Sequence, residues 1–127
     1  MIICTTIDQL RNQVREARAQ GAKIGLVPTM GALHEGHGAL IRTSAEHGDF
    51  TVVSVFVNPT QFAPTEDLDQ YPRNLESDIC LAQNCGAKVL FHPTAAQMYP
   101  GAAPTWVEAM GSVTQVLCGQ SRPIHFR

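Results

Sequence analysis

The residues best suited to chemistry lie in one stretch, GLVPTMGALHEGHGAL, from Gly25 to Leu40. An apolar run leads into Pro-Thr-Met-Gly, and His34 and His37 follow three residues apart among glycines. Amide N–H groups at a helix N-terminus attract phosphate, and histidine can become cationic where negative charge develops. The stretch therefore predicts a nucleotide site in which backbone and imidazole groups stabilise charge during displacement at phosphorus.

The glycines have separate tasks in this prediction. We expect Gly31 to allow a tight turn, and Gly36 to let the main chain approach a ligand closely. The stretch lacks the Gly-Lys-Ser/Thr of a Walker loop and the G-x-G-x-x-G of a dinucleotide site. A zinc site on His34 and His37 is a competing interpretation, but H-E-x-x-H and a placed third ligand are missing. The other histidines discussed, His47 and His92, are expected on the surface or in loops.

The surrounding sequence alternates helical stripes with short apolar runs, which must position these residues. Helices are expected from the Thr5-Thr6 cap to Gly21, from 37 to 48, and from an Asn74 cap to Gly86. Runs rich in β-branched residues predict buried strands near 23–28, 50–57 and 88–91. This alternation predicts an α/β domain, with a parallel sheet and helices on its faces.

The remaining segments are less regular. Residues 65–74 and 93–104 are expected to be loops, 105–110 an extended edge segment, and 112–119 a short helix with a Ser112 cap. Pro28 should end the first strand or occupy an unpaired position, because it has no N–H to donate. Ligands bind at the carboxyl ends of parallel strands, so the segments after the three strands should meet there.

Composition limits the function classes. The chain has 127 residues, 44% of them hydrophobic, with a formal charge of −2, which fits one globular domain and disfavours non-specific nucleic-acid binding. It has no apolar run of membrane-spanning length and no signal-peptide core, so a cytoplasmic location is expected. The four cysteines, Cys4, Cys80, Cys85 and Cys118, form no C-x-x-C pair. We expect buried free thiols rather than disulfides.

Several ordered blocks resemble one family. VPTMGALHEGH, VSVFVNPTQF, EDLDQYPRNLESD, FHPTAAQMYP and SRPIHFR together are similar to the pantoate–β-alanine ligases. The H-x-G-H element is also similar to that of nucleotidylyltransferases and class I aminoacyl-tRNA synthetases, which share a Rossmann-like fold. The later blocks resemble only the ligase.

The resemblance implies a Rossmann-like, nucleotidylyltransferase-type fold and an activity. Family members condense (R)-pantoate with β-alanine at the expense of ATP, through a pantoyl adenylate, and release pyrophosphate and AMP. Mg²⁺ is expected with ATP, although no protein ligand for a metal can be identified in this chain. The resemblance also implies a homodimer.

Site residues follow from the same resemblance. His37 matches the proton donor and His34 its partner at the phosphates, so these two are the catalytic candidates. Gln61 matches a glutamine that binds pantoate and lies close to β-alanine, and Met30 and Asn58 match further pantoate contacts. ATP is expected along Pro28, Thr29, Met30, Gly31, Ala32, Leu33, His34, Glu35, Gly36 and His37.

The resemblance also implies that more chain belongs to such enzymes. Residues 1–127 would form the N-terminal part of a truncated ATP- and pantoate-binding domain, with the C-terminal domain absent. The Gly-x-Lys-Asp block, a second pantoate-binding glutamine and a Lys-Met-Ser-Lys-Ser-like loop are missing, so we expect this chain alone to be inactive.

Three positions depart from the family pattern. Gly38 stands where a bulky apolar residue is usual, Cys118 replaces an acid, and Ile124 replaces a glycine.

Two alternative functions stay open: a non-catalytic fragment that binds nucleotide or pantoate, and a related adenylyltransferase that acts on another acid.

Overall fold

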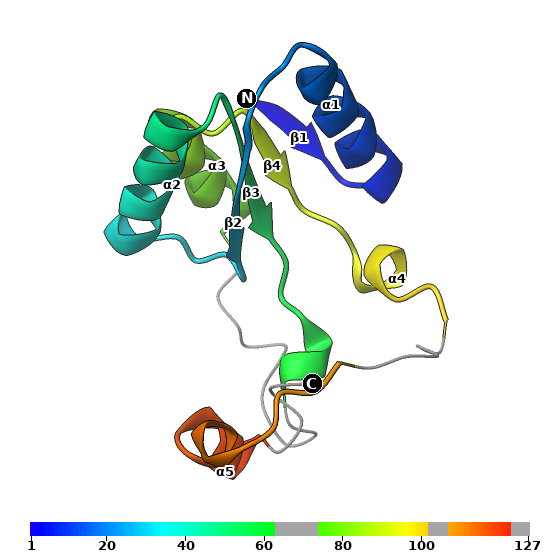
Figure 1. The fold of residues 1–127 in the computed structure, drawn as a ribbon, viewed down its shortest axis with the longest axis vertical. Helices are drawn as coiled ribbons and strands as arrows, with labels where there is room; N and C mark the ends of the chain where they lie inside the picture. Colours follow the sequence, from blue (N-terminus) through cyan, green and yellow to red (C-terminus); the bar gives the residue numbers. More distant parts are fainter. Residues whose placement is uncertain (63–73, 102–106, 123–127) are drawn as a thin grey trace.

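The computed structural model describes residues 1–62, 74–101 and 107–122. Its elements alternate between strands and helices as far as β4, and short helical turns follow (Figure 1). In chain order they are β1 (Ile2–Cys4), α1 (Ile7–Ala19), β2 (Ile24–Thr29), α2 (Glu35–His47), β3 (Phe50–Val55), the 3₁₀ turn η1 (Pro59–Gln61), α3 (Leu75–Asn84), β4 (Val89–Phe91), α4 (Ala95–Met98), the 3₁₀ turn η3 (Ser112–Gln115) and α5 (Cys118–Ser121).

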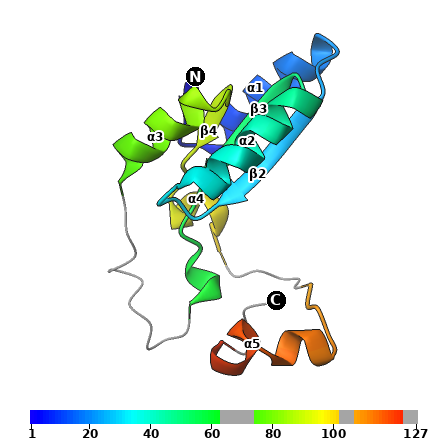
Figure 2. The same ribbon diagram turned by 90° about the vertical axis from the view of Figure 1, so that its left-hand side faces the viewer.

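The described strands form one parallel sheet in the order β1-β4-β3-β2. Helices α2 and α3 lie on one face and α1 on the other (Figures 1 and 2). The chain moves one way across the sheet from β2 to β4 and the opposite way from β1 to β2. Because right-handed connections that run in opposite directions leave a sheet on opposite sides, the helices divide between its two faces. The predicted α/β arrangement is confirmed.

Two apolar clusters fill the space between these layers. One joins β2, β3 and β4 to α2 and α3, and its most enclosed members include Ile41, Val53 and Leu90. The other lies beneath α1, where Cys4, Val52, Val89 and Phe91 meet Leu10 and Val14 of the helix. The sheet is therefore covered on both faces, which suits the nearly continuous apolar strands of the sequence.

The three predicted strands are confirmed, and so is the prediction that Pro28 occupies an unpaired position. Pro28 lies inside β2, at the edge of the described sheet, in register with Ser54. The Phe56 N–H donates to Thr29 O at 3.1 Å, so Thr29 turns its carbonyl toward β3. The neighbouring Pro28 then directs its nitrogen away from β3. Its missing donor costs this sheet no hydrogen bond.

The predicted ends of the first and third helices are also confirmed, whereas α2 begins at Glu35, two residues before the predicted start. Thr6 and Gln9 form a reciprocal capping box at the start of α1, and the Asn74 side chain accepts from the Ser77 N–H at 3.1 Å. Gly21 and Gly86 follow α1 and α3 with φ of 82° and 99°. Glycine adopts this left-handed backbone without the strain that other residues incur.

Several details of the prediction were wrong. The strand β1 was missed, and the expected loop 93–104 contains α4. The expected helix 112–119 is divided between η3 and α5, and Ser112 makes no side-chain cap, because Gly111 occupies the cap position. Residues 107–110 form no strand, and 65–73 and 105–106 lie outside the described residues.

The cysteine prediction holds only in part, since Cys4 and Cys85 are buried whereas Cys80 and Cys118 are exposed; all four are free. Among the helices of the described residues, none combines the length and hydropathy needed to cross a membrane.

The core predicts a sharp contrast between two neighbouring residues of α2. Ile41 is 0% exposed and Leu40 is 58% exposed. We expect Ile41→Ala to lower the free energy of unfolding by about 2–5 kcal/mol, because it leaves a cavity. Leu40→Ala is the control and should change it far less. Urea unfolding of the protein that contains these residues measures both; similar losses in the two variants would contradict the packing described here.

Candidate active site

The loop between β2 and α2 begins with a tight turn. The Thr29 hydroxyl donates to Ser54 O at 2.7 Å and accepts the Gly31 N–H at 3.2 Å. Gly31 has φ of 86°, and a Cβ built there would lie 3.0 Å from both Asp78 Oδ2 and Val55 Cγ1. Both the backbone conformation and the lack of space therefore require glycine, as predicted for this position.

A buried carboxylate from α3 holds the next two residues of this loop. The Ala32 N–H donates to Asp78 Oδ2 at 3.1 Å, and the Leu33 N–H donates to Asp78 Oδ1 at 2.6 Å. Asp78 is 2% exposed, so these charge-assisted bonds satisfy a group that would be costly to bury alone. In this structure the two amides point into the protein, although the resemblance implied that Ala32 and Leu33 lie along ATP.

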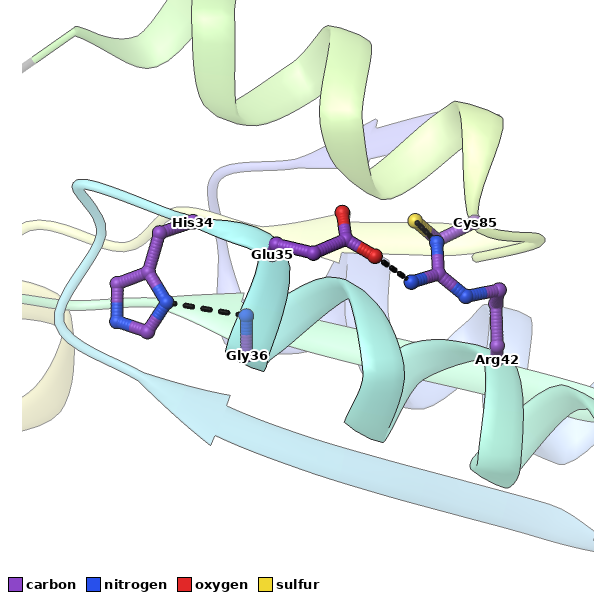
Figure 3. A network of polar contacts seen from close by, with 5 residues as sticks. All are labelled: His34, Glu35, Gly36, Arg42 and Cys85. Carbon is purple, nitrogen blue, oxygen red and sulfur yellow. Dashed lines mark hydrogen bonds and ion pairs between the residues drawn. The ribbon is translucent and has the colours of Figure 1, made fainter.

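The two histidines cap α2 reciprocally. His34 is the N-cap, and its Nδ1 accepts the Gly36 N–H at 3.1 Å (Figure 3). His37 Nδ1 accepts the His34 N–H at 3.3 Å, and the ring centroids lie 4.1 Å apart. Capping boxes usually pair Ser or Thr with Glu or Gln. Here two imidazoles make both capping bonds. The three-residue spacing of the histidines, which suggested a catalytic role, therefore also suits them to cap the helix N-terminus.

These bonds decide where the neutral rings carry their protons. A neutral imidazole that accepts at Nδ1 is protonated at Nε2, so His34 and His37 each keep an Nε2–H donor. Burial lowers the pKa of His37, the nearby His34 lowers it further, and Asp78 opposes the shift. His37 is therefore a neutral donor at pH 7.

Gly36 has the His34 ring as its neighbour. A Cβ there would lie 2.9 Å from His34 Cε1 and 3.1 Å from His34 Nδ1. Because that separation is too short, a side chain at position 36 would displace the ring from the helix end. The predicted approach of the Gly36 main chain to a ligand stays a prediction.

The first turn of α2 is tied to the end of α3 by a polar network. Glu35 pairs with the Arg42 guanidinium, which also contacts Cys85 Sγ at 3.0 Å (Figure 3). The hydrogen bond to Glu35 raises the pKa of Arg42. A Cβ at Gly38 would lie 3.1 Å from the same sulfur. Gly38, one of the departures from the family pattern, thus lets Cys85 pack closely against α2.

A pocket of about 360 Å³ opens at the carboxyl ends of the strands. Its walls are largely apolar with a few polar groups, as is usual for small-molecule sites. The lining residues are Met30, Gly31, Val55, Phe56, Val57, Pro59, Asn74, Leu75, Asp78, His92, Pro93, Thr94 and Ala95. Among the predicted site residues, Met30 and Gly31 are in this wall.

His92 was expected on the surface or in a loop, and it does lie in a loop, but it is not an exposed side chain. It follows β4, is half-buried and lines the pocket. Its Nδ1 lies 2.8 Å from Val55 O. A carbonyl only accepts, so Nδ1 donates and the neutral ring keeps Nε2 as an acceptor. By contrast, His47 is exposed near the C-terminal end of α2, as expected.

Asn58 and Gln61 follow β3: Asn58 is the N-cap of η1, and Gln61 is its last residue. The Asn58 side-chain oxygen accepts the Thr60 N–H at 3.1 Å, the Thr60 hydroxyl at 2.9 Å and the Tyr99 hydroxyl at 2.9 Å. The oxygen is fully used, so the amide nitrogen is the part of Asn58 that can serve a ligand. The Gln61 N–H donates to Asn58 O at 3.1 Å. Neither residue is in the wall of the 360 Å³ pocket.

Sequence reasoning missed Asp78, His92 and Tyr99. A signal for Asp78 did exist, because it falls on the inward stripe of α3 with Leu75, Ile79 and Ala82. A carboxylate at such a position must have donors in the interior. His92 and Tyr99 depend on contacts between segments far apart in the chain, which no local pattern shows.

Comparisons with known proteins agree on one family. The family described as Pantoate-beta-alanine ligase matches residues 2–127. Pantothenate synthetase of Acetivibrio thermocellus is 51% identical over 127 residues, covering 100% of this chain and 45% of the relative. That of Enterococcus faecalis is 52% identical with the same coverage of 100% and 45%. The chain thus spans less than half the length of these curated relatives.

Solved structures give the same result. Pantoate-beta-alanine ligase of Francisella tularensis, complexed with beta-gamma ATP and beta-alanine, has a TM-score of 0.88 and 40% identity, covering 99% of this chain and 48% of that one. Pantothenate synthetase of Thermus thermophilus has a TM-score of 0.82 and 43% identity, covering 99% and 44%. On the sequence match over residues 2–127 and these structural neighbours, the chain belongs to the pantoate–β-alanine ligase family.

Proposed function

We propose that the protein containing this chain condenses pantoate with β-alanine at the expense of ATP. The observation that carries the proposal is a juxtaposition: two histidines whose Nδ1 atoms cap α2 stand at the sheet edge where a mostly apolar 360 Å³ pocket opens. A small branched hydroxy acid suits such a pocket, and the Nε2–H groups suit phosphate oxygens. ATP and β-alanine are named with the Francisella tularensis neighbour.

The first step joins the acid to the nucleotide. A pantoate carboxylate oxygen attacks the α-phosphorus of ATP, the bond to the bridging oxygen breaks, and pyrophosphate leaves with the electron pair. Negative charge then grows on the phosphate oxygens. His34 and His37 donate to these oxygens through Nε2–H, and such preorganised donors stabilise the transition state without reorganising. His37 is proposed as the proton donor.

The second step transfers the acyl group. The amine of β-alanine attacks the acyl carbon of the adenylate, the acyl–oxygen bond breaks, and AMP leaves as the amine loses its proton. Gln61, Asn58 and Met30 are proposed to hold pantoate, with Gln61 also near β-alanine. In this arrangement the Asn58 amide nitrogen donates, because its oxygen is already bonded to Thr60 and Tyr99.

The proposed ATP contacts run from Pro28 to His37. Since Ala32 and Leu33 donate to Asp78, their amides serve the loop rather than the phosphates. Among the described residues, no group of three or more His, Cys, Asp or Glu side chains is placed to hold a metal ion. Mg²⁺ that accompanies ATP would have phosphate oxygens and water among its ligands.

The wider claims also remain proposals. We propose that residues 1–127 form the N-terminal part of the ATP- and pantoate-binding domain, that the chain alone does not turn over, and that the whole protein is a cytoplasmic homodimer. A non-catalytic binding fragment and an adenylyltransferase for another acid are the competing functions. Assaying the whole protein with pantoate and with other hydroxy acids separates these functions, because only the proposed one forms pantothenate.

We expect His37→Ala in the whole enzyme to slow adenylate formation about 10²–10³-fold, roughly 2.7–4 kcal/mol, because one donor to the developing charge is lost. Transfer from preformed pantoyl adenylate should slow far less, and ATP should still bind. Single-turnover kinetics measures the two steps separately. His47→Ala, an exposed histidine near the other end of the same helix, is the matched control. Equal slowing of both steps would contradict the proposed catalytic role and would show that His37 only caps the helix.

The lowered pKa of His37 predicts a pH dependence of stability. A base whose pKa is lower in the folded state than in the unfolded state stabilises the fold above its unfolded pKa, near 6.5. This contribution is lost as the pH falls from there through the folded pKa. Proton NMR should show His37 titrating below 6.5. The free energy of unfolding should differ less between about pH 7.5 and about pH 5.5 in His37→Gln than in the wild-type protein. A His37 midpoint above the reference value would contradict the prediction.

Tyr99 predicts an effect on the acid substrate alone. Tyr99→Phe keeps the ring beside Phe56 but removes the O–H that fixes the Asn58 amide. One hydrogen bond of about 0.5–1.5 kcal/mol should raise the pantoate KM several-fold, with the ATP KM nearly unchanged. Steady-state kinetics with each substrate varied in turn tests this. A matching rise in both KM values would show a general disturbance of the site instead.

A further inference from the structure

Asp78 stands out among the acidic residues because it is buried and serves another element. It lies in the first turn of α3, yet both carboxylate oxygens accept amides of the loop before α2. With 2% exposure it has little access to water. An acidic residue near a helix start usually interacts with that helix end at the surface. Asp78 instead joins α3 to the loop that leads into the histidine pair.

The loop conformation that Asp78 holds is one that the chain would not adopt unaided. Ala32 has φ of 51°, in the left-handed region that residues with a side chain rarely occupy. Such strain persists only where the surroundings enforce it. The two bonds from Asp78 fall on Ala32 itself and on Leu33, and Gly31 packs against the same carboxylate. The carboxylate therefore holds the loop at its strained residue, Ala32.

The restraint extends to the histidines through the main chain. Leu33 immediately precedes His34, whose backbone and ring make the reciprocal bonds of the cap. A change in the path of Ala32 and Leu33 would move the N-cap and, with it, both rings. Asp78 also acts through space, since its charge raises the pKa of His37 against the lowering by burial and by His34.

A direct substrate contact explains Asp78 less well. It lies in the wall of the pocket proposed for a carboxylate substrate, and a free negative charge there would repel both that acid and the phosphates. Its oxygens already accept two amide protons, which offsets the charge locally. The position is suited to holding the loop.

We propose that Asp78 is a positioning residue for adenylate formation: by clamping the amides of Ala32 and Leu33, it sets the place of His34 and His37 at the phosphates. This inference rests on the proposed function. It predicts that loss of the clamp slows the chemistry at phosphorus more than it weakens substrate binding. Misplacement of reacting groups by about 1 Å can slow a reaction about 10²-fold.

The kinetic test compares Asp78→Asn with Glu76→Gln in the whole protein, with ATP, Mg²⁺ and pantoate supplied. Glu76 lies on the same helix and is exposed, so its variant removes a charge nearby without touching the loop. We expect Asp78→Asn to lower kcat for adenylate formation about 10²-fold, with much smaller changes in KM and in transfer from preformed adenylate. Asp78→Asn kinetics like those of Glu76→Gln, or a loss confined to KM, would overturn the proposal.

A second measurement does not depend on the variant folding. In the unliganded wild-type protein, hydrogen exchange followed by NMR should find the Ala32 and Leu33 amides strongly protected. Their proton shifts should also be displaced downfield by the carboxylate. Exchange as fast as in an open loop would overturn the clamp. A wild-type protein that makes no adenylate would sink the proposed function instead, and protection of these amides would still decide whether the clamp exists.

Discussion

The amide N–H groups of the turn from β2 into α2 need hydrogen-bond acceptors. The side chains that provide these acceptors determine the geometry of the candidate site. A left-handed turn and a helix start both leave donors without main-chain partners. Four side chains accept these amides in turn along the chain: those of Thr29, Asp78, His37 and His34. The acceptors come from β2, from α3 and from α2 itself, so the loop is the junction of three elements.

This constraint links shape to electrostatics. Because Nδ1 of each histidine accepts a backbone amide, a neutral ring carries its proton on Nε2, so the cap itself supplies the donor that the proposed reaction requires. Phosphate oxygens and ring nitrogens can both accept helix amides, so a nucleotide that binds along the helix start competes with the caps.

The sheet and its helices could be predicted because their signals are local. The strand after Lys23 and the run before Asn58 have the β-branched character of buried strands, and Thr6, Asn74 and Gly86 mark helix ends by side-chain and backbone rules. The strand β1 has only 3 residues, too few for a period to show. The spacing of the histidine pair suggested a catalytic role, which stays a prediction, and its capping bonds were not foreseen. Asp78 and His92 belong to the pocket through contacts across 46 and 37 residues of sequence, respectively.

The packing of Gly38 against Cys85 affects how this sequence can change over time. The sulfur would lie 3.1 Å from a Cβ at position 38, so a side chain there requires Cys85 to give way or to become smaller. Substitution at 85 first leaves a void beside Arg42, whereas substitution at 38 first crowds the sulfur. The order of mutations therefore matters, and these two positions constrain each other's evolutionary history even though neither contacts a substrate in the proposed reaction.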